Sequence, residues 1–332
     1  MNNDMSDTPS ISVIIPAYNR ADTIGPVIES VIRQSLAVSE IMVIDDGSTD
    51  GTGDAVRKTF TEHRAWPGRL VLLEQANGGK SSALNLALPA AASEWIAFND
   101  SDDLWLPEKL EKQFQALARF PQCKVCFTDT LFGYQGTTTT LAIAGIKPHA
   151  AAGVMENLPL LLAGRASGIM MQTLVVQAAV MRAFGGFDTR LTVSQDTDLL
   201  FRLSLLAQFC YVNEPLVLLD REEARSDKLT RRHPTSNPTR LEEDAMMHAK
   251  WKSLAPPGDT ELARALHERH MSMLSALSNS HLLAGDRAKA GRCMKMAYAE
   301  SGSPKWIMKW SLLKFFPRFA AKVVRRRIAL KG

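Results

Sequence analysis

The sequence predicts an α/β fold, in which helices flank a mainly parallel sheet, followed by a helical C-terminal region. From residue 11 to residue 98, short apolar runs alternate with segments of helical spacing. Such alternation specifies right-handed βαβ units, whose strands pair in parallel. A polar loop follows each apolar run, and the chain shows only helical spacing beyond Pro238. Together these observations predict one sheet and a helical appendage.

The first strand and the first helix carry clear signals. The segment "ISVIIP" (11–16) is a short β-branched run that ends at Pro16, as expected of a buried strand. A helix over 23–34 follows, because apolar residues recur at helical spacing after Asp22, a suitable N-cap. By the same criteria we expect strands at 41–44, 70–73 and 95–98, and helices at 54–60 and 81–91.

Beyond Pro121 the pattern becomes less regular. The elements expected next are β-like runs at 122–128 and 170–176, an amphipathic helix at 194–208, and short strands at 209–212 and 216–219. Breaks that contain Pro or Gly then separate four or five helices. We therefore expect a flexible N-terminus over 1–10, an α/β domain over 11–225, and a helical region over 226–332.

Composition excludes several classes of protein. With 45 % hydrophobic residues, the chain is too apolar to be disordered. No window reaches the roughly 18 uncharged apolar residues of a membrane span, and the polar start lacks the features of a signal peptide. We therefore expect a cytoplasmic protein. Four cysteines are too few for a disulfide framework, and Cys123 and Cys126 in "CKVCF" favour a core strand over a redox or zinc site.

The formal charge of +4 is unevenly distributed. Residues 301–332 hold nine Lys or Arg and no acid, whereas residues 1–300 hold 30 bases and 35 acids. Because the basicity is local, it argues for a cationic tail and against binding of nucleic acid. Pro317 should divide this tail into two helices. The tail over 303–332 can rest on an anionic membrane surface, or its apolar stripe can pack against the protein while the bases stay solvated. That stripe comprises Trp306, Trp310, Leu313, Ala320, Val324 and Ile328.

Four polar loops follow the predicted parallel strands. Their sequences are "AYNRAD", "DDGSTDG", "EQANGGK" and "NDSDD". The carboxyl ends of parallel strands meet at one edge of a sheet, where ligands bind and helix N-termini point. We therefore expect the four loops to converge on one site.

Three carboxylates, Asp100, Asp102 and Asp103, lie within four positions of the fourth loop. Their mutual repulsion favours a bound cation, and Mg²⁺ or Mn²⁺ prefers carboxylates together with substrate phosphates. The alternative is a solvated turn whose aspartates cap the helix that follows.

The second and third loops also allow two interpretations each. Asp45 and Asp46 end a strand and either shape a turn or accept hydrogen bonds from a nucleobase or ribose, with Tyr18 as a stacking surface. Lys80 in "NGGKSS" starts a helix and is either an exposed lysine or a partner for phosphate. A P-loop is excluded, because position 74 is Glu where that pattern requires Gly.

Taken together, the motifs resemble those of family 2 glycosyltransferases, which have the GT-A fold. The resemblance spans about residues 11 to 220 in the family's order. Its blocks are "SVIIPAYNRAD" (12–22), "IMVIDDGSTDGT" (41–52), "NGGKSSALNLAL" (77–88), "WIAFNDSDDLWLPEKL" (95–110), "GGFD" (185–188) and "SQDTDLLFRL" (194–203). Each block is weak alone, but six in order are a specific pattern.

The resemblance implies a Rossmann-like nucleotide-diphospho-sugar transferase domain. It implies inverting transfer of a sugar from a nucleotide diphosphate donor, a UDP-sugar above others, to the hydroxyl of a saccharide or lipid-linked saccharide acceptor. It also implies Mn²⁺ or Mg²⁺ as cofactor. With the basic tail, it suggests bacterial surface polysaccharide or glycoconjugate assembly at the cytosolic face of the inner membrane.

The resemblance also assigns roles to individual residues. Asp102 and Asp103 match the DXD region and are expected to hold the metal, while the sequence leaves open which of the three aspartates ligates it. The residues expected to bind the donor are Pro16, Tyr18, Asp45, Asp46, Lys80, Asp100 and Asp102.

Asp196 takes the position of the family's general base, and would remove the acceptor proton as the hydroxyl attacks. Gln195 stands where the family usually has Glu, and this departure keeps open a non-catalytic nucleotide-sugar-binding protein. A sugar-nucleotide nucleotidyltransferase is a second alternative, but it would need a glycine-rich loop after the first strand. The loop over 219–232 resembles the segment that closes over the donor in this family, or is an ordinary solvated loop.

Overall fold

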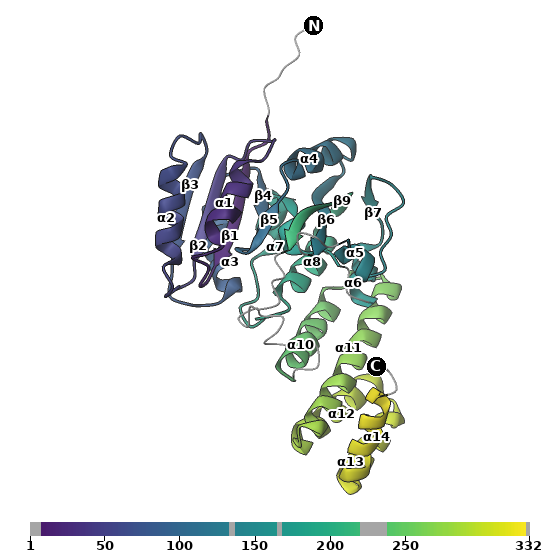
Figure 1. Ribbon diagram of the computed structural model, residues 1–332. Helices are drawn as coiled ribbons and strands as arrows, with labels where there is room; N and C mark the ends of the chain where they lie inside the picture. The colour runs from purple at the N-terminus through teal and green to yellow at the C-terminus, as the bar shows by residue number, and fades with distance from the viewer. Residues whose placement is uncertain (1–7, 133–136, 165–167, 220–237, 330–332) are drawn as a thin grey trace. The chain divides into compact units, whose positions relative to one another are not determined.

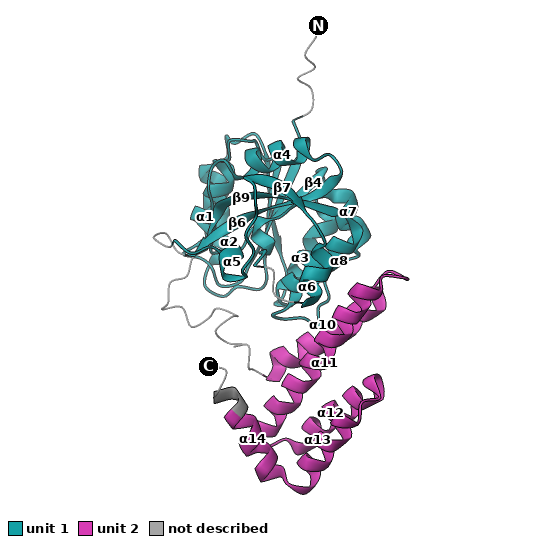
Figure 2. Cartoon of the chain, turned by 90° about the vertical axis from the view of Figure 1, so that its right-hand side faces the viewer, with its two compact units in different colours: residues 1–224 teal, residues 225–332 magenta. Residues whose placement is uncertain are grey.

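The computed structural model describes residues 8–132, 137–164, 168–219 and 238–329. Most of the predicted flexible N-terminus and nearly all of the loop over 219–232 lie outside these residues. The chain forms two compact units, residues 1–224 and residues 225–332, which Figure 2 shows in different colours.

Unit 1 contains a mixed nine-stranded sheet with helices packed around it (Figure 1). Its strand order is β3-β2-β1-β4-β8-β6-β9-β5, and β7 pairs with β9. Pairing is parallel from β3 to β4 and between β6 and β9, whereas β5, β7 and β8 pair antiparallel with their neighbours. The strands are β1 (Ile11–Ala17), β2 (Glu40–Asp45), β3 (Arg69–Glu74), β4 (Trp95–Phe98), β5 (Asp103–Trp105), β6 (Cys123–Phe132), β7 (Ala152–Met155), β8 (Val175–Gln177) and β9 (Gln208–Leu219).

The described helices of unit 1 connect these strands. They are α1 (Ile24–Ile32), α2 (Thr52–Glu62), α3 (Lys80–Ala87), α4 (Lys109–Arg119), α5 (Thr140–Ile143), α6 (Leu158–Gly164), α7 (Ala178–Phe184) and α8 (Gln195–Leu206). The predicted α/β class is confirmed, and the N-terminal half alternates strand and helix as expected.

Three element predictions need correction. The helix expected over 81–91 ends at Ala87, and a 3₁₀ turn follows that contains Pro89, because proline has no N–H to continue the helix. The two short strands expected at 209–212 and 216–219 form one strand, β9, whose register against β6 shifts near Pro215. The run expected over 170–176 is a 3₁₀ turn followed by β8.

The core of unit 1 is built around β1. Ile11, Val13 and Ile15 pack against α1, whose inward residues follow the helical spacing seen in the sequence. Ile14, which points to the opposite face, is also fully buried. Because apolar residues cover both faces of β1, polar groups next to this strand can reach solvent only at its end.

All four cysteines are free and buried. Cys126 in β6 lies opposite Cys210 in the parallel neighbour β9, within an apolar cluster. Burial raises the pKa of the Cys123 thiol to about 12, so this thiol stays protonated at neutral pH. These observations support the core-strand interpretation of "CKVCF".

Unit 2 is helical, and its described part contains α10 (Pro238–Leu254), α11 (Thr260–Leu283), α12 (Arg287–Ser301), α13 (Pro304–Phe315) and α14 (Pro317–Ala329). Asp259 and Asp286 cap α11 and α12 by accepting backbone N–H groups at 2.9 and 2.8 Å. Pro317 separates α13 from α14 as predicted. Among the described residues, no helix is long and apolar enough to cross a membrane.

Candidate active site

The loops after β1, β2, β3 and β4 are tied together by hydrogen bonds. Ser48 Oγ accepts the N–H of Asn19 at 2.9 Å, which joins the first loop to the second. Thr23 Oγ1 donates to the carbonyl of Ser101 at 2.8 Å, which joins the start of α1 to the fourth loop. The sheet therefore brings its polar loops to one edge, as the topology rule requires.

Asp46 fixes the third loop to the second. Its carboxylate is buried and accepts the N–H groups of Gly78 and Gly79, each at 2.8 Å, and Gln75 Nε2 at 2.6 Å. Gly79 has a φ of +84° immediately before α3, a conformation that side chains disfavour. Asp46 therefore orients the start of α3.

Asp45, Pro16 and Tyr18 were also expected at the nucleotide, and their side chains differ in exposure to solvent. Asp45 is buried and accepts the N–H of Ser48 at 2.9 Å, so it shapes its own turn. Pro16 is buried within β1, opposite Ile44 of β2. Tyr18 is 44 % exposed, which leaves its ring available for stacking.

Lys80 joins two acidic residues that are 96 positions apart. Its Nζ lies 2.7 Å from Asp100 Oδ1 and 3.5 Å from Asp196 Oδ1. Lys80 is the first residue of α3, Asp100 follows β4, and Asp196 lies in the first turn of α8. The three side chains are 18 %, 24 % and 25 % exposed, so the group is partly shielded from water. We call these three residues the Lys80 cluster.

Burial and the neighbouring charges both shift the pKa values of Lys80 and Asp196. Burial lowers the pKa of Lys80, but Asp100 and Asp196 outweigh it and raise the pKa above its ordinary value. Burial raises the pKa of Asp196, and Asp100 adds to the rise while Lys80 opposes it. Asp196 is therefore a stronger base than an ordinary aspartate, and the ammonium group beside it opposes the rise in its pKa.

Asp102 and Asp103 are adjacent in sequence but lie in different surroundings. Asp102 Oδ2 lies 3.9 Å from Arg20 Nε, and its charge acts on Lys80. Asp103 begins β5, is buried, and accepts Gln172 Nε2 at 2.6 Å. The carbonyl of Gln172 in turn accepts Trp105 Nε1 at 3.1 Å. Asp103 is thus held by core residues, and we retain Asp102 but not Asp103 as the proposed metal ligand.

The chemistry of the site fits a divalent cation that shares its ligands with a substrate. Within the described ranges, no three His, Cys, Asp or Glu side chains form a group that could hold a metal alone. Mg²⁺ commonly binds through one or two carboxylates together with substrate phosphates and water. Asp100 and Asp102 supply two such carboxylates, so the residues present fit Mn²⁺ or Mg²⁺ bound with a diphosphate.

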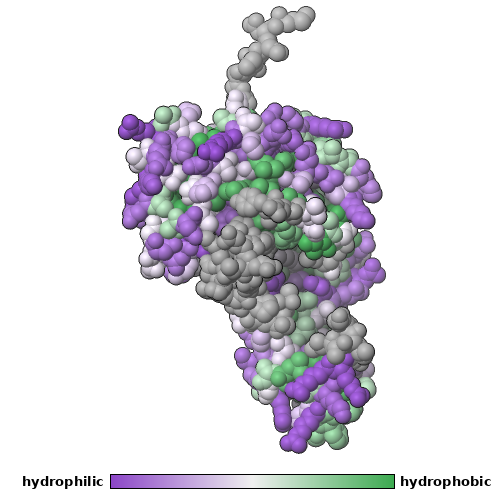
Figure 3. Space-filling model, viewed as in Figure 1, coloured by the Kyte–Doolittle hydropathy of each residue, from purple (hydrophilic) through white to green (hydrophobic). Residues whose placement is uncertain are grey.

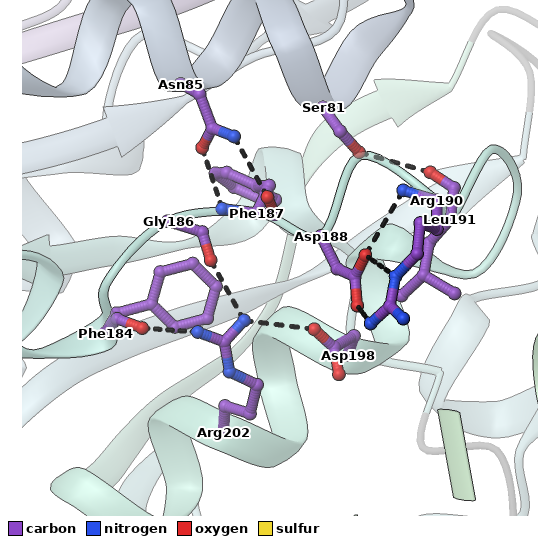
Figure 4. A network of polar contacts seen from close by, with 10 residues as sticks. All are labelled: Ser81, Asn85, Phe184, Gly186, Phe187, Asp188, Arg190, Leu191, Asp198 and Arg202. Atoms are coloured by element: carbon purple, nitrogen blue, oxygen red, sulfur yellow. Dashed lines mark hydrogen bonds and ion pairs between the residues drawn. The ribbon is translucent and has the colours of Figure 1, made fainter. Parts of the chain in front are cut away.

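The segment before α8 is fixed by α3, as Figure 4 shows. Asn85 Nδ2 donates to the carbonyl of Phe187 at 2.9 Å, and its Oδ1 accepts the N–H of the same residue at 2.7 Å. Ser81 Oγ donates to the carbonyl of Leu191 at 3.2 Å. One helix therefore carries Lys80 at its start and, further along the same helix, holds the loop that leads to Asp196.

Arg202 anchors the same loop from α8 (Figure 4). It donates to the carbonyls of Phe184 and Gly186 and pairs with Asp198 at 3.1 Å. Its guanidinium lies 3.8 Å from the centroid of the Phe184 ring. Asn85 and Arg202 were not singled out from the sequence, although both lie in the quoted blocks. The sequence signal that could have identified them is a polar residue among the apolar residues of a helix.

Gln195, the departure from the family pattern, is buried beside the Lys80 cluster. Its Oε1 has no hydrogen-bond partner among the described residues. A glutamate there would add a second buried negative charge next to Asp196. Glutamine avoids that charge.

Comparisons with known proteins agree with the motifs. A model of "Glycosyl transferase family 2" matches residues 12–146. The chain is 39 % identical over 131 residues to the putative teichuronic acid biosynthesis glycosyltransferase TuaG of Bacillus subtilis, covering 39 % of this chain and 50 % of that protein. It is 39 % identical over 109 residues to UDP-Glc:alpha-D-GlcNAc-diphosphoundecaprenol beta-1,3-glucosyltransferase WfgD of Escherichia coli, covering 33 % and 41 %. In both, the match spans half or less of the relative.

Solved structures extend the likeness to nearly the whole chain. Residues 1–349 of TarS from S. aureus, in complex with UDP-GlcNAc, superpose with a TM-score of 0.66 at 18 % identity, covering 96 % of this chain and 89 % of that one. The mannosyltransferase PcManGT of Pyrobaculum calidifontis, in complex with GDP-Man and Mn²⁺, gives 0.56 at 20 % identity, covering 95 % and 86 %. At these identities the likeness concerns the fold, which is GT-A.

Proposed function

Since this chain belongs to glycosyl transferase family 2 through residues 12–146, we propose that it transfers a sugar from a nucleotide diphosphate donor to an acceptor hydroxyl. The observation that carries the proposal is the Lys80 cluster, in which the carboxylate after β4 and the carboxylate that opens α8 share one ammonium group. A donor-binding aspartate and a general base must lie this close to act on one sugar.

We assign the donor side to the loops after β1, β2 and β4. Tyr18 stacks on the base, Asp45 and Asp46 hold the loops that surround it, and Pro16 lies next to the last residue of the strand beneath. Asp100 and Asp102 face the diphosphate, and Lys80 pairs with its negative charge. When bound at Asp102, Mn²⁺ or Mg²⁺ would neutralise the charge that develops on the departing diphosphate.

We assign the general base to Asp196. The acceptor oxygen bonds to the anomeric carbon as the bond to the diphosphate breaks, and Asp196 takes the hydroxyl proton. This single displacement inverts the anomeric configuration. Because an aspartate is a weak base, the proton moves late in the displacement, and the raised pKa of Asp196 improves its capacity to accept it.

For the donor we propose a UDP-sugar and for the acceptor a lipid-linked saccharide, in polysaccharide or glycoconjugate assembly. Two similar proteins support this choice: the TarS structure contains UDP-GlcNAc, and the name of WfgD specifies UDP-Glc and a diphosphoundecaprenol-linked acceptor.

The first experiment identifies the donor. The full chain is heated with UDP-, GDP- and dTDP-sugars in the presence of Mn²⁺, because a ligand that binds the native state raises its melting temperature. We expect a UDP-sugar to give the largest rise. A largest rise with a GDP- or dTDP-sugar would replace the proposed nucleotide, and no rise with any donor would contradict the proposal of a transferase.

The second experiment tests the base. Asp196→Asn should reduce transfer by about 10²- to 10⁴-fold and leave the Kd of the donor within a few fold. Asp54→Asn, at an exposed carboxylate of α2, is the control and should keep both the transfer rate and the donor Kd of the parent. Equal loss of transfer and of donor binding in Asp196→Asn would contradict the assignment.

A further inference from the structure

The apolar stripe predicted in the basic tail faces the interior of unit 2 at its five described side chains, and Ile328 lies outside them. Trp306 packs into one apolar cluster with residues of α10 and α11, and Leu313 and Ala320 pack into a second with Leu282 and Met294. Trp310 and Val324 lie partly buried against the second cluster. These residues stabilise the fold of unit 2, so they are not available to an external surface.

A second apolar set lies on the outside of the same two helices. Met308, Phe315, Phe316 and Phe319 are 72 %, 65 %, 63 % and 58 % exposed. Met308 and Phe315 are seven residues apart in α13 and therefore lie on one face. The three phenylalanines flank Pro317, where α13 ends and α14 begins. Exposed large apolar groups that are gathered in this way indicate an interaction surface.

The same two helices also carry exposed basic side chains close in sequence to these apolar groups. The exposed bases are Lys314, Arg318, Lys322, Arg325 and Arg326. Phe319, Lys322 and Arg326 follow the helical i, i+3, i+7 spacing and share one face of α14. Lys314 Nζ lies 5.3 Å from the Phe315 ring, so the two kinds of residue are in direct proximity. In Figure 3, hydrophilic and hydrophobic residues lie side by side near the end of unit 2.

We call Met308, Phe315, Phe316, Phe319 and the five bases the outer face. The sequence from 301 to 332 contains no acid that could pair with these bases. A second copy of the chain, placed against this face by two-fold symmetry, would set bases against bases. A nucleic acid would satisfy the bases, but would leave the aliphatic Met308 and several phenylalanines without an apolar environment.

We propose that the outer face docks on a membrane surface that contains anionic lipids. The phenylalanine rings and Met308 enter the boundary between headgroups and acyl chains, and the bases lie over the lipid phosphates. Such a surface offers both an apolar layer for the rings and negative charge for the bases. This inference concerns binding and does not depend on the proposed transfer reaction, so each can fail without the other.

The test is sedimentation of the full chain with lipid vesicles. We expect binding to vesicles of phosphatidylcholine with phosphatidylglycerol, and little binding to phosphatidylcholine alone. Raising the ionic strength from about 0.1 M to about 1 M shortens the Debye length from about 10 Å to about 3 Å, and should weaken the binding. Equal binding to both kinds of vesicle, or to neither, would overturn the proposal.

Two sets of variants separate the apolar and the basic contributions. Phe315→Ser with Phe316→Ser and Phe319→Ser should reduce binding at least about tenfold, because the rings no longer enter the membrane. Ile143→Ser with Leu206→Ser, two exposed apolar residues of unit 1, is the control and should bind as the parent does. Unchanged binding by the triple variant would contradict insertion of the rings.

The charge variant combines Lys322→Gln with Arg326→Gln. It should reduce binding about tenfold and flatten its salt dependence, because two positive charges near the lipid surface are lost. Lys58→Gln with Arg33→Gln removes one lysine and one arginine from exposed sites of unit 1 and should have little effect.

Folding and assembly are checked in parallel. Melting curves and light scattering are recorded for every variant, and Asp196→Asn is included because it should bind vesicles normally. If the phenylalanine variant lowered the molecular mass of the protein in solution while vesicle binding stayed unchanged, the outer face would be a contact between copies of the chain, and the lipid proposal would be wrong.

Discussion

Charged residues are arranged in opposite ways in the two units of this protein. In unit 1, Lys80 lies between Asp100 and Asp196, and each of these charges is partly buried and paired. On the outer face of unit 2, bases are exposed and the surrounding sequence holds no acid. Paired charge in a shielded place keeps side chains in fixed positions, whereas unpaired charge of one sign on a surface attracts a partner of opposite sign. The first arrangement suits chemistry and the second suits docking.

Removing the proposed metal should have the largest effect on unit 1. EDTA should reduce transfer by at least about 100-fold, because the charge on the departing diphosphate would lose several kcal/mol of stabilisation. Adding back Mn²⁺ or Mg²⁺ should restore the rate, which is measured as release of nucleoside diphosphate. Full turnover in verified metal-free buffer would mean that Lys80 and Arg20 suffice, and would remove the metal from the proposal.

Replacing Lys80 breaks the paired arrangement directly. In Lys80→Met, two partly buried carboxylates repel each other without a cation, so we expect about 1–3 kcal/mol less stability and about 100-fold slower transfer. Urea melts and initial rates give the two quantities. Lys58→Met, at an exposed lysine of α2, should change neither. Transfer at the parent rate in Lys80→Met would show that the pairing is dispensable.

The loop that leads to Asp196 offers a smaller perturbation. Asn85→Ala removes both hydrogen bonds to the backbone of Phe187, and we expect about 1–3 kcal/mol less stability and about tenfold lower kcat. The KM for the donor should stay nearly constant, since both of these hydrogen bonds hold Phe187, which is not a proposed donor-binding residue. Gln115→Ala, which removes an exposed amide, is the matched control. A rise in KM with unchanged kcat would argue against a positioning role.

The pH dependence of stability and of activity tests the paired charges of unit 1 in another way. Because the pKa of Asp196 is raised above 3.8, folding takes up a proton between the unfolded and the folded pKa, and ionised Asp196 destabilises the native state above that range. The proposed base acts in its ionised form, so we expect the acid limb of kcat/KM to lie above pH 3.8. In Lys80→Met the limb should move to still higher pH, because the cation that opposes protonation is gone. If the acid limb of kcat/KM did not move in Lys80→Met, the group that titrates would not be Asp196.

Removing charge from the outer face should have the smallest effect on folding. Lys322→Gln with Arg326→Gln should change the free energy of unfolding by no more than about 0.5 kcal/mol, since both side chains are exposed. Urea melts of the full chain measure this quantity. A loss several times larger would show that these bases stabilise unit 2, and the contrast between the two units would weaken.

Local patterns in the sequence were sufficient for the fold class. The β-branched run at 11–16 and the apolar spacing of the following helix produced β1 and α1 within a residue or two, because both elements bury the side chains that define their period. Prediction failed where proline and a register shift intervened. The single strand β9 was expected as two, since its pairing with β6 is decided by residues far away in sequence.

The sequence alone determined which residue types stand at the ends of the strands, and these residues carry the resemblance to family 2 glycosyltransferases. Only the tertiary structure decided which of these residues meet. It brought Asp100 and Asp196 to one lysine and turned Asp103 toward Gln172. It also directed the described side chains of the apolar stripe inward while leaving Phe315, Phe316 and Phe319 outside. The physical reason is that periodicity specifies the faces of an element, whereas contacts between distant residues depend on how those faces pack against one another.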